Sequence, residues 1–338
     1  MMADVSMWEG YVNGVNLGGW LSQCGHTKEH YDSYIAEEDL RKIAAAGYDH
    51  VRLPVDYMLV QTKEGQYIED GFSYIDTCIE WCGKYQLNMV LDLHRTMGYS
   101  FDEGYGESGF FETEKYQEMF YALWEEFAKR YGQYADRVSF EILNEIVDKD
   151  YMDQWKEIMD KCIKRIRTYA PQTDILVAGY WHSSVMALKD LPLPVDSHIV
   201  YNFHCYEPLI FTHQGAGWVK GMPKDYRLSI SHTVEELEQE SSKVFSGEIN
   251  CFNFIKNKKK KFGKEFFVDF FAEAVRVAKE RGVRLYCGEY GVIDLADKED
   301  AAIWLQAIRE AFKECGFGGA VWNYKGLDYE ALVGRAMK

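Results

Sequence analysis

Eight short apolar runs alternate with segments of helical period along nearly the whole chain. The runs predict strands near residues 14–17, 50–53, 89–93, 138–143, 175–178, 199–203, 284–288 and 319–321. Apolar residues recur at spacings of three and four in the predicted helices, at 36–46, 73–85, 113–131, 151–169, 264–281 and 298–315. This alternation is typical of a parallel sheet with crossover helices, and eight strands favour a closed (β/α)8 TIM barrel over a doubly wound sheet.

Two parts of the chain depart from a regular barrel. Between the sixth and seventh strands the chain is more than twice as long as the about 30 residues of a βα unit, which predicts an inserted subdomain at about 209–263. This insertion could act as a lid or form a solvated subdomain, and the two interpretations are equally well supported. After the last strand only 324–338 remain, so we expect a short or missing eighth helix. No Pro/Gly/Ser-rich linker divides the chain, and residues 1–338 are therefore expected to form one domain.

Composition limits the partners of the chain. A formal net charge of −16 disfavours binding to nucleic acid or to anionic membranes, and there is no run of 18 apolar residues. Scattered cysteines without a Cys-x-x-Cys pair, and a first strand not followed by Gly-x-Gly-x-x-Gly, predict neither a metal nor a dinucleotide cofactor. The N-terminus lacks the features of a signal peptide, which favours a cytoplasmic monomer, with secretion left open if a signal has been removed.

Polar and aromatic side chains gather where the predicted strands end. Two of them are carboxylates, Glu145 and Glu289, which are costly to bury and which a barrel would place at its catalytic end. The others are Trp20, Arg52, His94, Asn144, Trp181, His204, Tyr206 and Trp322. Paired carboxylates among arginine, histidine and indole side chains suit hydrolysis of a glycosidic bond, in which one acid protonates the leaving oxygen and a carboxylate attacks the anomeric carbon.

Seven motifs in order along the chain resemble glycoside hydrolase family 5, the retaining cellulase-type enzymes of clan A. They are Gly-Val-Asn-Leu-Gly-Gly-Trp at 14–20, Val-Arg-Leu-Pro at 51–54, Leu-Asp-Leu-His at 91–94, Leu-Asn-Glu at 143–145, His-Cys-Tyr at 204–206, Gly-Glu-Tyr-Gly at 288–291 and Trp-Asn-Tyr at 322–324. The resemblance covers nearly the whole chain. It implies a retaining mechanism, and a retaining enzyme is expected to hold its two carboxyl groups ~5 Å apart.

The resemblance also implies a role for each residue. Glu145 would be the acid/base, with a raised pKa, and Glu289 the nucleophile, kept ionised by Arg52 and Tyr206. The remaining residues would contact the sugar: Asn16 from the first motif, Asn144 at the 2-hydroxyl, His94 and His204 at the cleavage site, Trp322 as its floor, and Trp20 and Trp181 as platforms further along the cleft.

The substrate remains open within this family. The resemblance favours endo action on β-1,4 bonds of cellulose-type or mixed-linkage β-1,3-1,4-glucans, with β-mannanase, glucomannanase or exo-β-1,3-glucanase activity as alternatives. A carbohydrate-binding barrel without catalysis is disfavoured because both carboxylates are present. A metal-dependent hydrolase with His94 and His204 as ligands is disfavoured because the first strand has no His-x-His pair.

Overall fold

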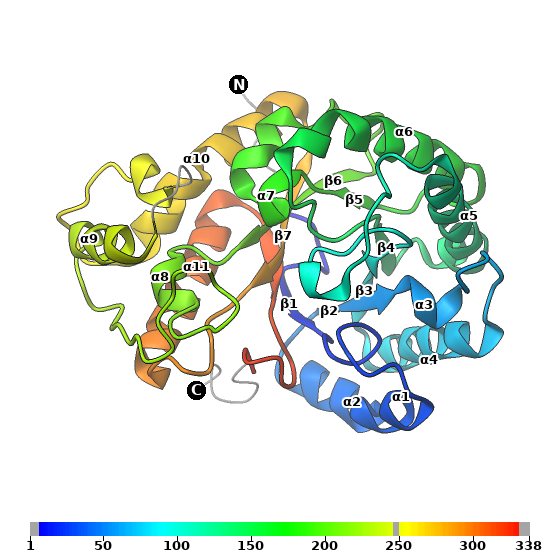
Figure 1. The fold of residues 1–338 in the computed structure, drawn as a ribbon, viewed down its shortest axis with the longest axis horizontal. Coiled ribbons are helices and arrows are strands. Elements are labelled where there is room, and N and C mark those ends of the chain that lie inside the picture. Colours follow the sequence, from blue (N-terminus) through cyan, green and yellow to red (C-terminus); the bar gives the residue numbers. More distant parts are fainter. Residues whose placement is uncertain (1–6, 246–249, 331–338) are drawn as a thin grey trace.

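The computed structural model describes residues 7–245 and 250–330, and eight parallel strands form its centre (Figure 1). The strands are β1 (Asn13–Asn16), β2 (His50–Asp56), β3 (Asn88–Arg95), β4 (Val138–Glu141), β5 (Ile175–Val177), β6 (Ile199–Cys205), β7 (Arg284–Tyr290) and β8 (Gly318–Val321). Each strand pairs with the next, and β8 pairs with β1, so the sheet closes on itself. The predicted (β/α)8 barrel is confirmed, and all eight strands lie where the apolar runs predicted them.

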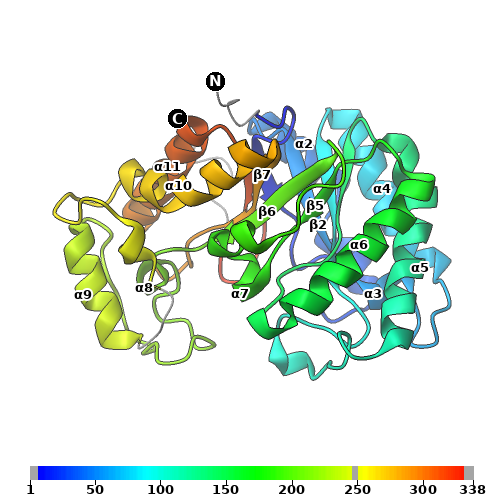
Figure 2. The ribbon, with the colours of Figure 1, turned by 90° about the horizontal axis from the view of Figure 1, so that it is seen from above.

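Helices surround the barrel, as Figure 2 shows from above. The main crossover helices are α2 (Glu37–Ala45), α4 (Glu69–Tyr85), α5 (Glu114–Tyr131), α6 (Met152–Tyr169), α10 (Lys264–Arg281) and α11 (Lys298–Cys315). Shorter helices are α1 (Lys28–Tyr34), α3 (Tyr57–Val60) and α7 (Tyr180–Ser183). The crossover from β5 to β6 is short and consists of α7 and a 3₁₀ segment, Val185–Asp190.

Amphipathic periodicity decides which face of each helix meets the barrel. In α6 the buried residues, among them Trp155, Ile158, Cys162 and Ile166, recur at spacings of three and four, and Trp155 donates its indole N–H to a strand-end carbonyl. Such helices cover the outer face of the sheet, and the strands pack against one another to form the closed barrel. The barrel is therefore a rigid frame from which the strand-end side chains project.

The insertion between β6 and α10 lies beside the barrel as a lobe of its own (Figure 1). It contains α8 (Leu209–Thr212), α9 (Val234–Val244) and a 3₁₀ segment, Cys251–Phe254. A capping box starts α9, with the Thr233 side chain accepting from the amide of Glu236. The described residues of this region, 209–245 and 250–263, thus include short helices, and the insertion as a subdomain or a lid stays a prediction.

The chain beyond β8 carries little regular structure. Residues 322–330 contain no helix, and residues 331–338 lie outside the described part, so the predicted short or missing eighth helix is tested only as far as residue 330. Among the described residues, no helix is long and apolar enough to cross a membrane.

Candidate active site

Parallel strands bring the predicted site residues to one end of the barrel. Arg52 lies in β2, His204 in β6 and Glu289 in β7, while Glu145 follows β4 by four residues. Glu145 has a φ of 38°, a left-handed conformation that a side chain other than glycine seldom adopts. The Tyr99 hydroxyl supports this turn, because it donates to the Glu145 carbonyl at 2.6 Å and accepts from the Val147 amide at 2.9 Å. A strained backbone held from both sides is typical of a functional position.

Arg52 is the centre of a fully buried hydrogen-bond network. Its Nε and Nη2 donate to the two oxygens of Glu141 at 2.7 and 2.8 Å, and Nη1 donates to Glu289 Oε1 at 2.7 Å. Nη2 also lies 2.9 Å from Asn144 Oδ1 and 3.0 Å from Asp92 Oδ2. Only a guanidinium offers this many donors in a fixed planar arrangement. Arg52 therefore holds the surrounding side chains in place from the buried side of the site and does not face the cleft.

Two carboxylates of this network, Asp92 and Glu141, are absent from the set predicted from sequence. Both are buried and face each other in the register of β3 and β4. Burial raises the pKa of Glu141, and the positive charge of Arg52 opposes that rise. The sequence did contain a signal for both residues: a charged residue inside an apolar strand requires a buried partner of opposite charge.

Glu289 has a different hydrogen-bond partner on each oxygen. Arg52 donates to Oε1, and the Tyr206 hydroxyl donates to Oε2 at 2.9 Å. Burial, followed by the nearby negative charge of Glu289, raises the pKa of Tyr206 well above its ordinary value, so this phenol remains a donor. A full positive charge and a neutral donor both stabilise the ionised carboxylate.

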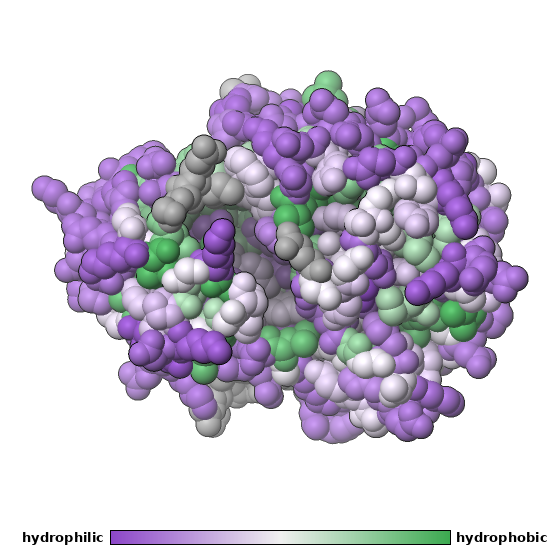
Figure 3. All heavy atoms as spheres, in the orientation of Figure 1, coloured by the Kyte–Doolittle hydropathy of each residue, from purple (hydrophilic) through white to green (hydrophobic). Residues whose placement is uncertain are grey.

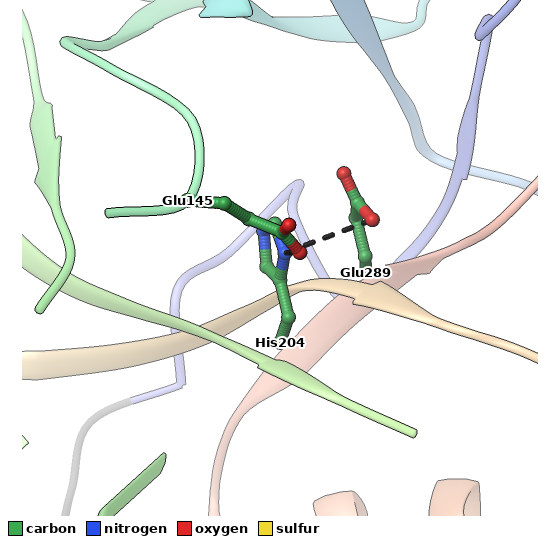
Figure 4. Close-up of side chains that lie close together, drawn as sticks. All are labelled: Glu145, His204 and Glu289. Atoms are coloured by element: carbon green, nitrogen blue, oxygen red, sulfur yellow. Dashed lines mark hydrogen bonds and ion pairs between the residues drawn. The ribbon is translucent and has the colours of Figure 1, made fainter. Parts of the chain in front are cut away.

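Glu145 is held by two histidines. His204 Nδ1 lies 2.8 Å from Oε1, and His182 Nδ1 lies 2.9 Å from Oε2. Figure 4 shows the carboxylates of Glu145 and Glu289 close together, with the His204 ring behind the Glu145 side chain. One oxygen of each carboxylate and one nitrogen of His204 lie within 4.8 Å of one another. That separation matches a retaining glycosidase, because an inverting enzyme holds its carboxyl groups about 6.5–9.5 Å apart.

The pKa of Glu145 is lowered, whereas its predicted role led us to expect a raised value. Burial raises it, but the hydrogen bonds from His182 and His204 outweigh burial and hold it well below the ordinary range. The same contacts raise the pKa of both histidines against the effect of their own burial. The two histidines thus stabilise the ionised form of Glu145, which is opposite to the expected raised pKa.

Several buried polar atoms at this end of the barrel have no partner within the protein. They include His94 Nε2 and Asn144 Nδ2, whose other polar atoms contact Asp92 and Arg52. The Trp322 ring lies parallel to His94 with centroids 5.9 Å apart, and only glycine fits at Gly18, because a Cβ there would lie 2.6 Å from that ring. An unused amide N–H and an unused imidazole nitrogen beside an indole suit the hydroxyl groups and the flat face of a sugar. The face in Figure 3 is hollowed between the barrel and the insertion.

Two residues that were predicted to contact the sugar are buried away from the cleft. Trp20 is 1% exposed, donates its indole N–H to the Tyr31 carbonyl and stacks on Trp81, so the expectation of a sugar platform is corrected. Asn16 is fully buried and uses its amide on backbone carbonyls of β7 and β8 and on Arg52. It orients the site and offers no atom to a ligand. Trp181 is partly exposed, so its predicted role as a platform stays open.

The chemistry of the site disfavours a cation. Glu145, His204 and Glu289 could together approach a metal ion among the residues described. The guanidinium of Arg52 is bonded to Glu289, however, and a second cation beside it would be repelled. His204 Nδ1 is also already hydrogen-bonded to Glu145 at 2.8 Å and lies 3.6 Å from Glu289, so this nitrogen is not free to bind an ion.

Comparison with known proteins agrees with this geometry. Residues 11–326 match the model of the cellulase family, glycosyl hydrolase family 5. The chain is 43% identical to cellodextrinase A of Ruminococcus flavefaciens, over 91% of this chain and 85% of that protein. It is 39% identical to endoglucanase C of Acetivibrio thermocellus, over 94% and 92% of the two chains. A crystal structure of the clostridial cellulose synthase subunit Z from Clostridioides difficile superposes with a TM-score of 0.74 at 26% identity, covering 94% of this chain and 93% of that one. Fold, motifs and relatives agree: the chain is a glycoside hydrolase and belongs to glycosyl hydrolase family 5, the cellulase family.

Proposed function

We propose that this enzyme hydrolyses β-1,4 bonds of cellulose-type and mixed-linkage glucans by double displacement, with Glu145 as acid/base and Glu289 as nucleophile. The observation that carries the proposal is the pair of carboxylates within 4.8 Å, one bonded to an arginine and a phenol and the other to two histidines. Unequal partners of this kind assign different roles to two chemically identical groups.

In the first step the Glu289 carboxylate attacks the anomeric carbon while Glu145 protonates the departing glycosidic oxygen. Arg52 and Tyr206 keep Glu289 ionised until the attack, so the nucleophile needs no separate base. Asn144 Nδ2, which has no partner in the protein, is the donor proposed for the sugar 2-hydroxyl. That contact strengthens in the transition state and therefore contributes to rate rather than to ground-state binding.

In the second step a water molecule hydrolyses the glycosyl ester. Glu145, now ionised, removes a proton from this water, and the new hydroxyl bonds to the anomeric carbon with retained configuration. His94 and Trp322 would hold the sugar at the cleavage site, one through its free Nε2 and the other through its ring face. Trp181 would form a platform beyond that sugar.

Two variants test the assignment of roles. Glu289→Gln should lower turnover of barley β-glucan on the order of 10⁴-fold or more while binding of cellotetraose persists. Glu145→Ala should recover activity on 2,4-dinitrophenyl β-cellobioside when azide is added, and the product should be the β-azide. Near-normal hydrolysis of polymer by either variant would disprove the roles.

The similarity to cellodextrinase A favours a second candidate, action on short soluble oligosaccharides. Product lengths separate the candidates: a ladder of oligosaccharides from barley β-glucan or carboxymethylcellulose indicates endo action on polymer, whereas activity confined to cellodextrins indicates the second. Glucomannan and laminarin should be poor substrates if the proposal is right. Preferred hydrolysis of either would assign the enzyme to the mannan-type or the β-1,3-glucan-type activities of the family.

A further inference from the structure

Of the two histidines that hold Glu145, His182 is the one open to water. Its Nδ1 lies 2.9 Å from Glu145 Oε2, yet 54% of its side-chain surface is exposed, whereas the His204 side chain is only 2% exposed. His204 also keeps its second nitrogen inside, 4.0 Å from Glu141. Two histidines thus hold the same carboxylate, one from the interior of the barrel and one from the surface.

The loop that carries His182 is fixed against the segment that carries Glu145. Trp181, His182 and Ser183 all have positive φ values of 53–56°. The amides of Trp181 and His182 donate to the carbonyls of Val147 and Ile146, each at 3.1 Å. Three successive left-handed residues are costly, and the hydrogen bonds to the chain just after Glu145 compensate that cost. The imidazole is therefore placed on Oε2 by the backbone and not by a mobile side chain alone.

Each element packed around His182 contributes a charged or titratable group. Glu145, His204 and Glu289 act on it from the ends of β4, β6 and β7. Lys149 lies over the neighbouring Trp181 ring at 5.4 Å, and His213 follows α8. Among these groups, Glu145 alone is hydrogen-bonded to His182. The protonation of Glu145 and that of His182 are therefore coupled.

We propose that His182 is a positioning residue that stores the working proton of Glu145 between substrates and returns it when a glucan binds. In the free enzyme the pair is imidazolium and carboxylate. A bound glucan excludes water, which disfavours the ion pair relative to the neutral pair. The Nδ1–H bond then breaks as an O–H bond forms on Oε2, and no other bond changes.

The stored proton balances over one turnover. Glu145 gives it to the glycosidic oxygen, and the water that enters in the second step returns one to Glu145. When product leaves and water re-enters, the proton moves back to His182 Nδ1. Because this inference rests on the proposed acid/base role of Glu145, its test must distinguish failure of the inference from failure of that role.

The test compares pH profiles of kcat/KM for His182→Asn and the unmodified enzyme, with 4-nitrophenyl and 2,4-dinitrophenyl β-cellobiosides. Asparagine tolerates the left-handed backbone and keeps an N–H donor, but it cannot store a proton. We expect the alkaline limb for the nitrophenyl substrate to move about one pH unit lower, because the proton is then lost from a smaller coupled set. For the dinitrophenyl substrate, whose leaving group needs little protonation, the change should be within about threefold. His182→Gly, which also permits positive φ, should shift the limb in the same direction and serves if the asparagine variant folds poorly.

His213→Asn is the matched control, because His213 lies near the same pair without a hydrogen bond to Glu145, and its alkaline limb should stay in place. An unshifted limb in the His182 variants, or a loss of equal size at every pH and with both leaving groups, would overturn the inference. Glu145→Gln separates the two proposals. If the alkaline limb survives in Glu145→Gln, the acid/base assignment of Glu145 is wrong. If the limb is abolished in Glu145→Gln but does not shift in the His182 variants, only the proposed proton storage by His182 is refuted.

Discussion

Charged groups are paired at both ends of the barrel, partly exposed at the N-terminal end and buried at the C-terminal end, and the two ends arrange them differently. At the N-terminal end Asp174 accepts two hydrogen bonds from Arg284, one from the Trp8 indole and one from His198, and the Trp8 ring stacks on Tyr11. Four donors thus satisfy a single carboxylate. At the C-terminal end a single guanidinium serves three carboxylates, and several buried polar atoms have no partner among the described residues. The satisfied network stabilises the fold, and the incomplete one leaves groups free to bind a sugar.

Arg52→Lys should have the largest effect, because it acts on folding and on catalysis together. A lysine cannot make the bidentate contact to Glu141 while also reaching Glu289, so one carboxylate is left without a partner. We expect a loss of about 3–5 kcal/mol in the free energy of unfolding and a fall of about 100-fold in kcat/KM. Urea unfolding and initial-rate assays on the same preparation measure both, and loss of only one would show that the network is divisible.

Asp174→Asn should reduce stability without changing catalysis. The substitution weakens the pairing with Arg284 at the far end of the barrel, so we expect about 2 kcal/mol less stability. The kcat/KM of the folded enzyme should stay within about twofold at 25 °C. A change in the pH profile of kcat/KM would contradict the division of roles between the two ends.

His26→Asn should have the smallest effect, and the effect should depend on pH. His26 lies at the catalytic end, with Nε2 3.0 Å from Asp56, and burial lowers its pKa while Asp56 and Cys24 outweigh burial and raise it to about 9. A raised folded-state pKa stabilises fully below the unfolded value of about 6.5, and the stabilisation is lost as the pH rises to about 9.

The variant should therefore lose on the order of 1 kcal/mol at pH 6 and much less at pH 9.5, measured by urea unfolding. His232→Asn, on the exposed side of the insertion, is the control and should change little at either pH. Equal losses for His26→Asn at the two pH values would show that its packing, not its charge, stabilises the loop after β1.

The fold was predictable because the apolar periods of strand and helix differ, and those periods do not depend on distant contacts. Glu145 and Glu289 were predictable because a carboxylate at a buried strand end is unusual. Glu141 and Asp92 were missed although they lie inside strands, since their partner, Arg52, is assigned only by the barrel register. His182 was missed because the fifth crossover has no period, and a loop histidine has no signature in sequence.

Trp20 shows the opposite error. Its position at the end of the first predicted strand suggested a sugar platform, but its ring turns into the core against Trp81. Glu145 was assigned a raised pKa on the basis of its role, and the two imidazoles reverse the direction. In both residues the direction of the side chain or its neighbours, neither of which is local in sequence, decided the outcome.

The sequence by itself determined the barrel, its strand order and the two carboxylates, because periodicity and the cost of burying charge are local properties of the chain. Only the tertiary structure decided which groups surround each carboxylate: Arg52 and Tyr206 at Glu289, and His204 and His182 at Glu145. These partners come from different strands and loops, and the closure of the barrel brings them within hydrogen-bonding distance. The proposed roles of nucleophile and acid/base therefore rest on these different partners, since the two glutamates themselves are chemically identical.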